Sequence, residues 1–256
     1  MSTVLDVAFC LLLVGVAVST LALAVPDESE EMTVDSDATA HSLATVTASV
    51  PADNEQVHGT LAEHLAHATV TNATYDGERI IRSTYPDAVE GEIEAQTGVR
   101  SHITARWEPY PDAPIGSRVS VGTAPPPTVD VAATKLTVDS GMTAFETEAS
   151  FESIAASIAK AYVERLFPPE RTRVKLVDAR TAKPTAGRYE EAEAAFDADL
   201  GGAIADADTE RANGRLVAAL ADRLESDLRL QYAAAENAAA ETATGEIKIV
   251  VRRWEQ

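Results

Sequence analysis

The residues best suited to metal chemistry are three histidines and a glutamate that lie close together, namely His58, Glu63, His64 and His67. If this stretch is helical, His64 and His67 lie on neighbouring positions of one face, and imidazole is a common zinc ligand. In zinc proteases, however, two histidines stand four residues apart with the glutamate directly after the first, whereas here Glu63 precedes His64. No cysteine or histidine-rich stretch follows to complete four ligands. The sequence therefore predicts no metal site, and we expect these side chains to lie on a solvated helix surface, where alanine at both His64 and His67 leaves folding nearly unchanged.

Catalytic and cofactor motifs give no positive signal. Glu90 and Glu94 have the spacing of an acid–base pair, but such pairs are inevitable among 41 acidic residues. The chain has no GxGxxG, Walker or GxSxG motif. We therefore expect no enzymatic activity, no catalytic residue and no cofactor. The triplet Asn72-Ala73-Thr74 fits a glycosylation acceptor, so Asn72 is a candidate modification site.

The charge of the chain is strongly unbalanced, with 41 acidic residues against 21 basic ones and a formal net charge of −20. Such an excess indicates either a surface for a basic partner or a whole surface adapted to high salt. The acids are spread along the chain and do not form one tail, which favours adaptation to salt, because concentrated ions screen the self-repulsion of a compact acidic protein. The same excess argues against a nucleic-acid partner, which requires a basic patch.

One segment has the properties of a membrane anchor. Residues 7–25 contain no charged side chain, and 19 residues of helix are about 28 Å long, close to the thickness of the hydrocarbon core of a bilayer. Pro26 and an acidic stretch follow. The alternative is a cleaved secretory signal, because Ala22 and Ala24 are small enough for a signal peptidase, but residues 1–6 carry no lysine or arginine. We expect a single-pass protein of the cell membrane that contacts the bilayer through residues 7–25, with the bulk of the chain outside the cell.

The rest of the chain predicts an α+β fold in two parts. After a short N-terminus at 1–6, the helix at 7–25 and an acidic tether at 26–40, a strand-rich unit is expected over 41–141 and a mainly helical unit with a final strand over 142–256. In the first unit, alternating apolar residues predict strands at 42–50, 99–107, 117–121 and 129–138, and three-to-four spacing predicts helices at 57–70 and 87–96.

In the second unit, Phe151, Ile154 and Ile158 begin an amphipathic pattern that predicts a helix over 151–166. Further elements are expected there. They are a strand at 173–177, helices at 187–199 and 210–240 with a break at Asn213-Gly214, and a strand at 246–251 followed by a packed Trp254.

The opening residues carry a resemblance. The run from Ser2 to Ala8, leading directly into the apolar residues 11–14, resembles small haloarchaeal membrane proteins of unassigned function, which tend to be encoded beside type IV pilus or Tad-like secretion genes. Pilin-like subunits carry an acid near the start of the apolar helix, and the resemblance makes Asp6 a candidate assembly contact. A basic-Gly processing site is missing before Asp6, unlike in pilins.

Together, these features predict a membrane-anchored, non-enzymatic accessory or pilin-like component of a haloarchaeal surface or secretion assembly, with pilus or secretion-platform proteins as its partners. The alternative is an anchored or secreted extracellular binding protein.

Overall fold

The computed structural model describes residues 35–52, 55–145 and 150–255. The predicted anchor at 7–25 and the candidate contact Asp6 lie outside these residues. Among the described residues, no helix is both long enough and apolar enough to cross a membrane. Residues 34–256 form one compact unit, and the description below concerns this unit alone.

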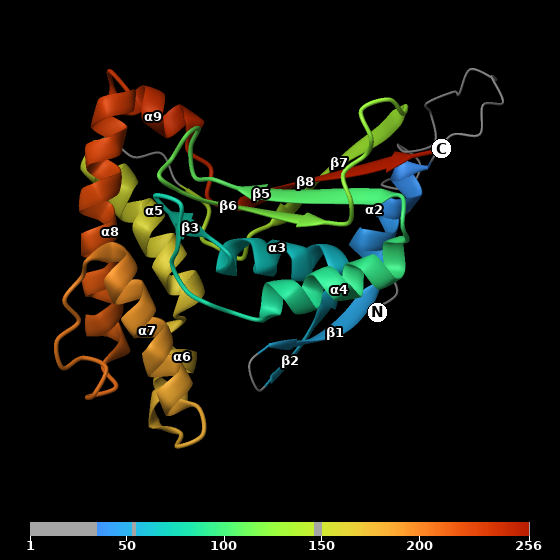
Figure 1. Cartoon of the computed structure of the whole chain (residues 1–256). Coiled ribbons are helices and arrows are strands. Elements are labelled where there is room, and N and C mark those ends of the chain that lie inside the picture. Colours follow the sequence, from blue (N-terminus) through green and yellow to red (C-terminus); the bar gives the residue numbers. More distant parts are fainter. Residues whose placement is uncertain (1–34, 53–54, 146–149, 256) are drawn as a thin grey trace, which may run out of the picture. The chain divides into compact units, whose positions relative to one another are not determined.

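The fold is α+β, as predicted, and it ends in a strand (Figure 1). The first part of the unit consists of α2 Ser36–Thr45, β1 Thr47–Ala52, β2 Glu55–Thr60, α3 Leu61–Thr71, β3 Thr74–Tyr75, β4 Glu78–Arg79, α4 Tyr85–Thr97, β5 Ser101–Trp107, β6 Ile115–Val121 and β7 Val131–Asp139. The second part consists of α5 Phe151–Leu166, α6 Pro169–Val177, α7 Ala182–Phe196, α8 Thr209–Gln231, α9 Ala235–Glu241 and β8 Glu246–Trp254.

A six-stranded sheet with the order β4-β3-β6-β5-β8-β7 organises the first part, and β1 and β2 form a separate hairpin. All pairs are antiparallel. In β8, Ile247, Ile249 and Val251 are buried, whereas Glu246 and Lys248 are exposed and Val250 is half-buried. This period of two is what a strand with one covered face requires. Helices α2, α3 and α4 lie beneath the sheet in Figure 1.

The C-terminal strand unites the two parts that the sequence suggested. β8 pairs with β5 on one side and with β7 on the other. The predicted regions 41–141 and 142–256 therefore share one sheet within one compact unit.

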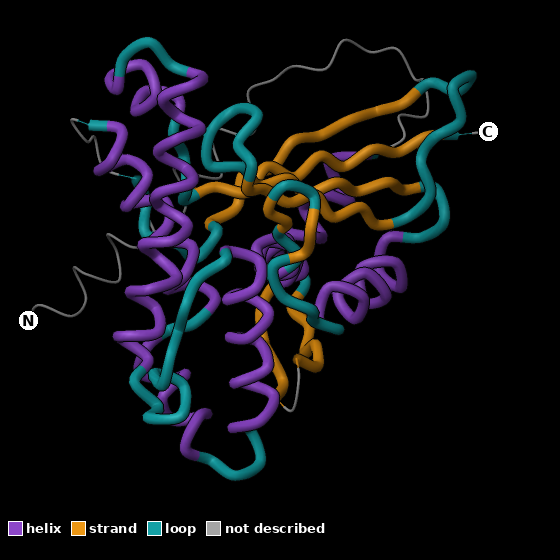
Figure 2. The backbone as a smooth tube through the Cα atoms, turned by 60° about the vertical axis from the view of Figure 1, so that its left-hand side comes forward, coloured by secondary structure: helices purple, strands orange, loops and turns teal. Residues whose placement is uncertain are grey.

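The helices of the second part lie at one end of the sheet in Figure 1, and Figure 2 shows them as a layer beside the strands. α5 and α8 pack along each other, and α8 buries four leucines at four-residue spacing: Leu216, Leu220, Leu224 and Leu228. Trp107 on β5 stacks on Tyr162 of α5 at a centroid distance of 5.4 Å. Each fully buried leucine contributes about 1.5–3 kcal/mol, so the α5–α8 contact is a main source of stability.

Several boundaries differ from those predicted at the N-terminal end of the unit. The predicted strand at 42–50 is divided between the end of α2 and β1, and α2 also begins inside the predicted tether. Asp35 accepts a hydrogen bond from the amide of Ala38, so it caps α2 in a stretch that shows no apolar periodicity. The predicted helix at 57–70 begins only at Leu61, because Thr60 and Glu63 form a capping box there.

The predicted strand at 173–177 is wrong, because these residues form the end of α6. Pro169 occupies the first turn of α6, where a missing amide hydrogen costs nothing. Glu170 in the first turn and Lys175 in the last turn suit the helix dipole. Alternation over only five residues was too short to distinguish a strand from a helix.

The predicted helix at 210–240 is two helices, α8 and α9, and the break predicted at Asn213-Gly214 is wrong. Asn213 is buried, accepts a hydrogen bond from the Tyr189 hydroxyl at 2.7 Å and donates one to the Phe167 carbonyl at 2.7 Å. The asparagine side chain is thus used to link three helical segments and does not terminate a helix. Trp254 is buried, as predicted, but it belongs to β8 itself.

Candidate functional site

The histidine cluster of the sequence is dispersed over different environments. His58 lies on β2 and its Nδ1 is 2.6 Å from the Ser49 hydroxyl. The Glu63 carboxylate accepts a hydrogen bond from the Thr60 amide and is occupied in capping α3. Within the described ranges, no three His, Cys, Asp or Glu side chains are grouped closely enough to hold a metal ion.

His64 is buried, so its predicted place on a solvated surface is wrong. Only 1% of the residue is exposed. Its Nε2 is 3.1 Å from the Ala48 carbonyl and its Nδ1 is 2.6 Å from the Tyr85 hydroxyl. Because a carbonyl only accepts, Nε2 donates, and in the neutral ring Nδ1 accepts from Tyr85. His64 therefore connects α3 to β1 and α4.

We expect His64→Ala to lower the free energy of unfolding by roughly 1–3 kcal/mol, because it leaves the Tyr85 hydroxyl and the Ala48 carbonyl without this partner. His67→Ala is the matched control on the same helix and should cost less than about 1 kcal/mol, since His67 is only partly buried. Urea unfolding in molar KCl measures both values. Equal costs for the two variants would contradict this role of His64.

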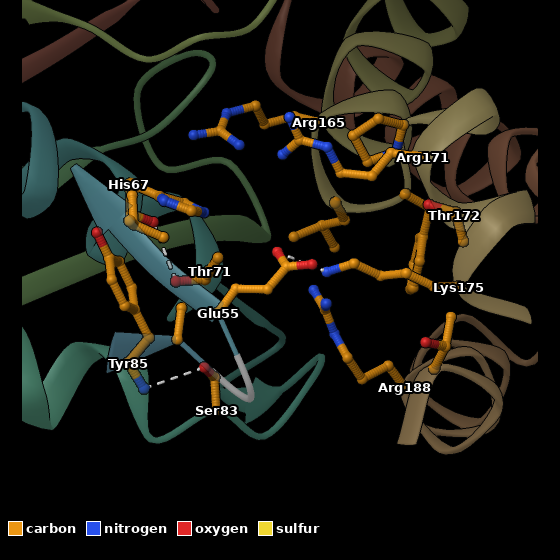
Figure 3. A pocket seen from close by; sticks show the side chains of 16 residues that line it. Glu55, His67, Thr71, Ser83, Tyr85, Arg165, Arg171, Thr172, Lys175 and Arg188 are labelled. Carbon is orange, nitrogen blue, oxygen red and sulfur yellow. Dashed lines mark hydrogen bonds and ion pairs between the residues drawn. The ribbon is translucent and has the colours of Figure 1, made fainter. Parts of the chain in front are cut away.

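His67 faces a pocket with a volume of about 120 Å³. The pocket lies where β2, α3 and α4 meet the helical layer, and Figure 3 shows the side chains that line it. Four of them carry positive charge: Arg165 from α5, Arg171 and Lys175 from α6, and Arg188 from α7. Among the described residues that line the pocket, Glu55 is the one with an acidic side chain. In a chain with 41 acidic and 21 basic residues, this is a marked local reversal of charge.

The electrostatics at His67 reflect this reversal. Burial, followed by the charges of Arg165 and Arg188, lowers the pKa of His67 from 6.5 to about 3. His67 is therefore neutral at physiological pH, and the positive charge of the pocket comes from arginine and lysine. Burial also raises the pKa of the neighbouring Tyr85, whose ring lies 4.7 Å from that of His67, so that Tyr85 keeps its proton.

The cationic side chains are held in different ways. Lys175 donates a hydrogen bond to Glu55 at 3.1 Å, and Arg165 donates from Nε to the Ser140 carbonyl at 3.1 Å. The Arg188 guanidinium lies over the Phe167 ring at 5.6 Å. Arg171 is exposed in the first turn of α6, where the positive end of the helix dipole adds to its charge. Such an arrangement can bind an anion through several charge-assisted hydrogen bonds.

The sequence reasoning missed this pocket, because its charged residues are spread from Glu55 to Arg188 and only the fold brings them together. The one local signal was the basic pattern Arg171-Thr172-Arg173-Val174-Lys175, which places Arg171 and Lys175 one helical turn apart. That signal was lost when 173–177 was interpreted as a strand, since Arg171 then lies outside the element.

The other candidate residues lie elsewhere. Asn72 is the C-cap of α3 and is half-buried. Glu90 lies on α4, and burial, followed by the charges of Glu94 and Asp87, raises its pKa. Neither Asn72 nor Glu90 lines the pocket.

Comparison with known proteins gives one match. The model of a family of unknown function, DUF7284, matches residues 5–254, a range that includes both the predicted anchor and nearly all of the compact unit. No curated protein matches the chain. No solved structure matches it either.

Proposed function

We propose a function for this chain, which belongs to the DUF7284 family of unknown function, from its own residues. It is a membrane-anchored, non-enzymatic binding protein that holds an anionic ligand in the pocket around His67. The observation that carries this proposal is the gathering of Arg165, Arg171, Lys175 and Arg188 around one cavity of an otherwise acidic protein. Like charges repel one another, so such a cluster is stabilised when an anion occupies it.

The location of the charges supports binding in concentrated salt. Surface ion pairs are screened within about 3 Å at 1 M salt, whereas partly buried groups are screened much less. Arg165 and Arg188 are partly buried, and burial also dominates the pKa shift of His67. A pocket of this kind keeps its attraction for an anion where an exposed basic patch loses it.

The anchor is proposed from residues 7–25, which are uncharged and long enough to cross a bilayer. The full-length protein is then expected to remain in the membrane fraction after washing with high salt and with carbonate. Recovery of the intact chain, residues 1–25 included, in the wash would contradict the anchor. A mature N-terminus near Val25 would instead establish a cleaved signal and a secreted binding protein.

The binding function is tested with full-length protein in detergent, by equilibrium dialysis against phosphate, sulfate and acetate at constant ionic strength in KCl. We expect at least one of these anions to bind, and Arg171→Gln with Lys175→Gln to weaken that binding roughly tenfold or more, or about 1.4 kcal/mol. Arg173→Gln with Lys183→Gln removes the same charge from exposed positions outside the pocket and should leave the affinity unchanged. Equal losses in the two double variants, or no binding of any anion, would contradict the proposal.

A second candidate function is an accessory or pilin-like component of a surface or secretion assembly. It is favoured by β7, which ends the order of the six-stranded sheet and has no buried residue along its length. An edge strand with unpaired backbone groups is a common site for pairing with another chain. Extraction in mild detergent as a larger complex with other subunits would favour this candidate, and extraction as a monomer would count against it.

A further inference from the structure

We propose that the ligand of the pocket carries a doubly charged oxyanion, a phosphate or a phosphate monoester, and that this group binds by displacing the Glu55 carboxylate from Lys175. The inference rests on the proposed binding function and specifies the chemistry of its ligand. It also assigns Glu55 a role, that of a carboxylate which occupies the anion position when no ligand is bound.

The charge of the lining favours a dianion over a monoanion. Among the described residues of the lining, Arg165, Arg171 and Lys175 carry three positive charges and Glu55 carries one negative charge, while His67 is neutral. A carboxylate ligand in the place of Glu55 would compensate only one of these three positive charges. A phosphate dianion brings two charges and four oxygens, and each guanidinium presents a planar set of donors that fits phosphate oxygens.

The position of Glu55 makes it a competitor for the same donors. Glu55 comes from the β1–β2 hairpin, and Lys175 lies far away in the sequence on α6, yet their side chains meet at 3.1 Å. Figure 3 shows the Glu55 carboxylate reaching toward the cationic side chains of the helical layer. The Glu55 side chain is 55% exposed. An ion pair this exposed contributes little stability, so a stronger anion can replace Glu55 at small cost.

A neighbouring cavity has room for the remainder of an ester. It has a volume of about 240 Å³ and shares Glu55, Lys175, Thr185 and Arg188 with the basic pocket. Arg82 and Glu191 also line this cavity, and their side chains lie 3.6 Å apart as an ion pair. A phosphate held by the arginines can therefore extend its organic substituent past Lys175 into a polar space.

The test uses full-length protein in detergent at pH 8, where a phosphate group is mostly doubly charged, with ionic strength fixed by KCl. The probes are inorganic phosphate, glycerol 3-phosphate, a short-chain phosphatidic acid and acetate. We expect each phosphate compound to bind about tenfold or more tightly than acetate. Tightest binding of phosphatidic acid would support a lipid source of the phosphate, and tightest binding of a soluble probe would support a solute. Both outcomes support the inference.

The role of Glu55 is tested by Glu55→Gln, which we expect to tighten phosphate binding about three- to fivefold by removing the competing charge. Glu170→Gln changes the net charge equally at an exposed position of α6 outside the pocket and should have a much smaller effect. If acetate binds as tightly as phosphate, or Glu55→Gln does not tighten phosphate binding, this inference is overturned. The proposed binding function then still stands, provided that Arg171→Gln with Lys175→Gln weakens whatever binding is observed.

Discussion

Replacing Trp107 with alanine is expected to lower the free energy of unfolding by about 3–5 kcal/mol, which corresponds to a fall in Tm of roughly 6–20 °C. Trp107 is 1% exposed and stacks on Tyr162, so its removal opens a cavity at the junction between the sheet and the helical layer. Thermal unfolding followed by circular dichroism in molar KCl measures this loss.

Two variants serve as controls. Trp107→Phe keeps an aromatic ring beside Tyr162 and loses the hydrogen bond from Nε1 to the Thr244 carbonyl, but that carbonyl also accepts from the Ser140 hydroxyl. Its cost should therefore be well below that of alanine. Val99→Ala removes a side chain that is 92% exposed and should change stability by less than about 0.5 kcal/mol. A cost for Trp107→Ala as small as that for Val99→Ala would show that the junction is not tightly packed.

The second large effect concerns salt. A fragment that begins at Met32 is expected to be least stable at low ionic strength and to gain roughly 10 °C or more in Tm as KCl rises to molar concentration. The physical reason is the excess of acids in a net charge of −20, whose mutual repulsion is screened by concentrated ions.

The same titration with a neutral osmolyte at equal osmolarity separates screening from general solvent exclusion. If charge screening is the cause, the osmolyte raises Tm by only a small part of the increase that KCl of equal osmolarity produces. A Tm that stays flat or falls with KCl would rule out the adaptation to salt that the acidic composition suggested.

Long periodic segments were predicted well from the sequence. The helix at 151–166 has the predicted limits, because its apolar residues are spaced by three and four and Ser150 caps it. The strand 99–107 and the helix before it were also found, and Gly98, with a φ of +76°, ends α4 as its left-handed backbone allows. The short, polar helices α2 and α6 were not predicted, because α2 depends on its Asp35 cap and α6 on its contacts with α7 and α8.

The pocket could not be predicted from local patterns. The sequence predicted that His67 lies on a solvated surface and binds no metal. Its low pKa could not be predicted, because burial and the charges of Arg165 and Arg188, about a hundred residues away in the sequence, cause it. Asn213 illustrates the same limit. An Asn-Gly pair favours a turn, but two buried hydrogen-bond partners stabilise the helix instead.

The place of β8 has a consequence for the order in which the chain folds. β7 has β8 as its partner in the sheet, and β8 begins at Glu246, more than a hundred residues after the end of β7 at Asp139. During synthesis, β7 therefore stays without its partner strand until more than a hundred further residues have been made, and β5 lacks one of its two neighbouring strands for as long. The sheet is complete only when β8 has been made, which makes a nascent chain, or a chain truncated before β8, vulnerable to pairing with other strands.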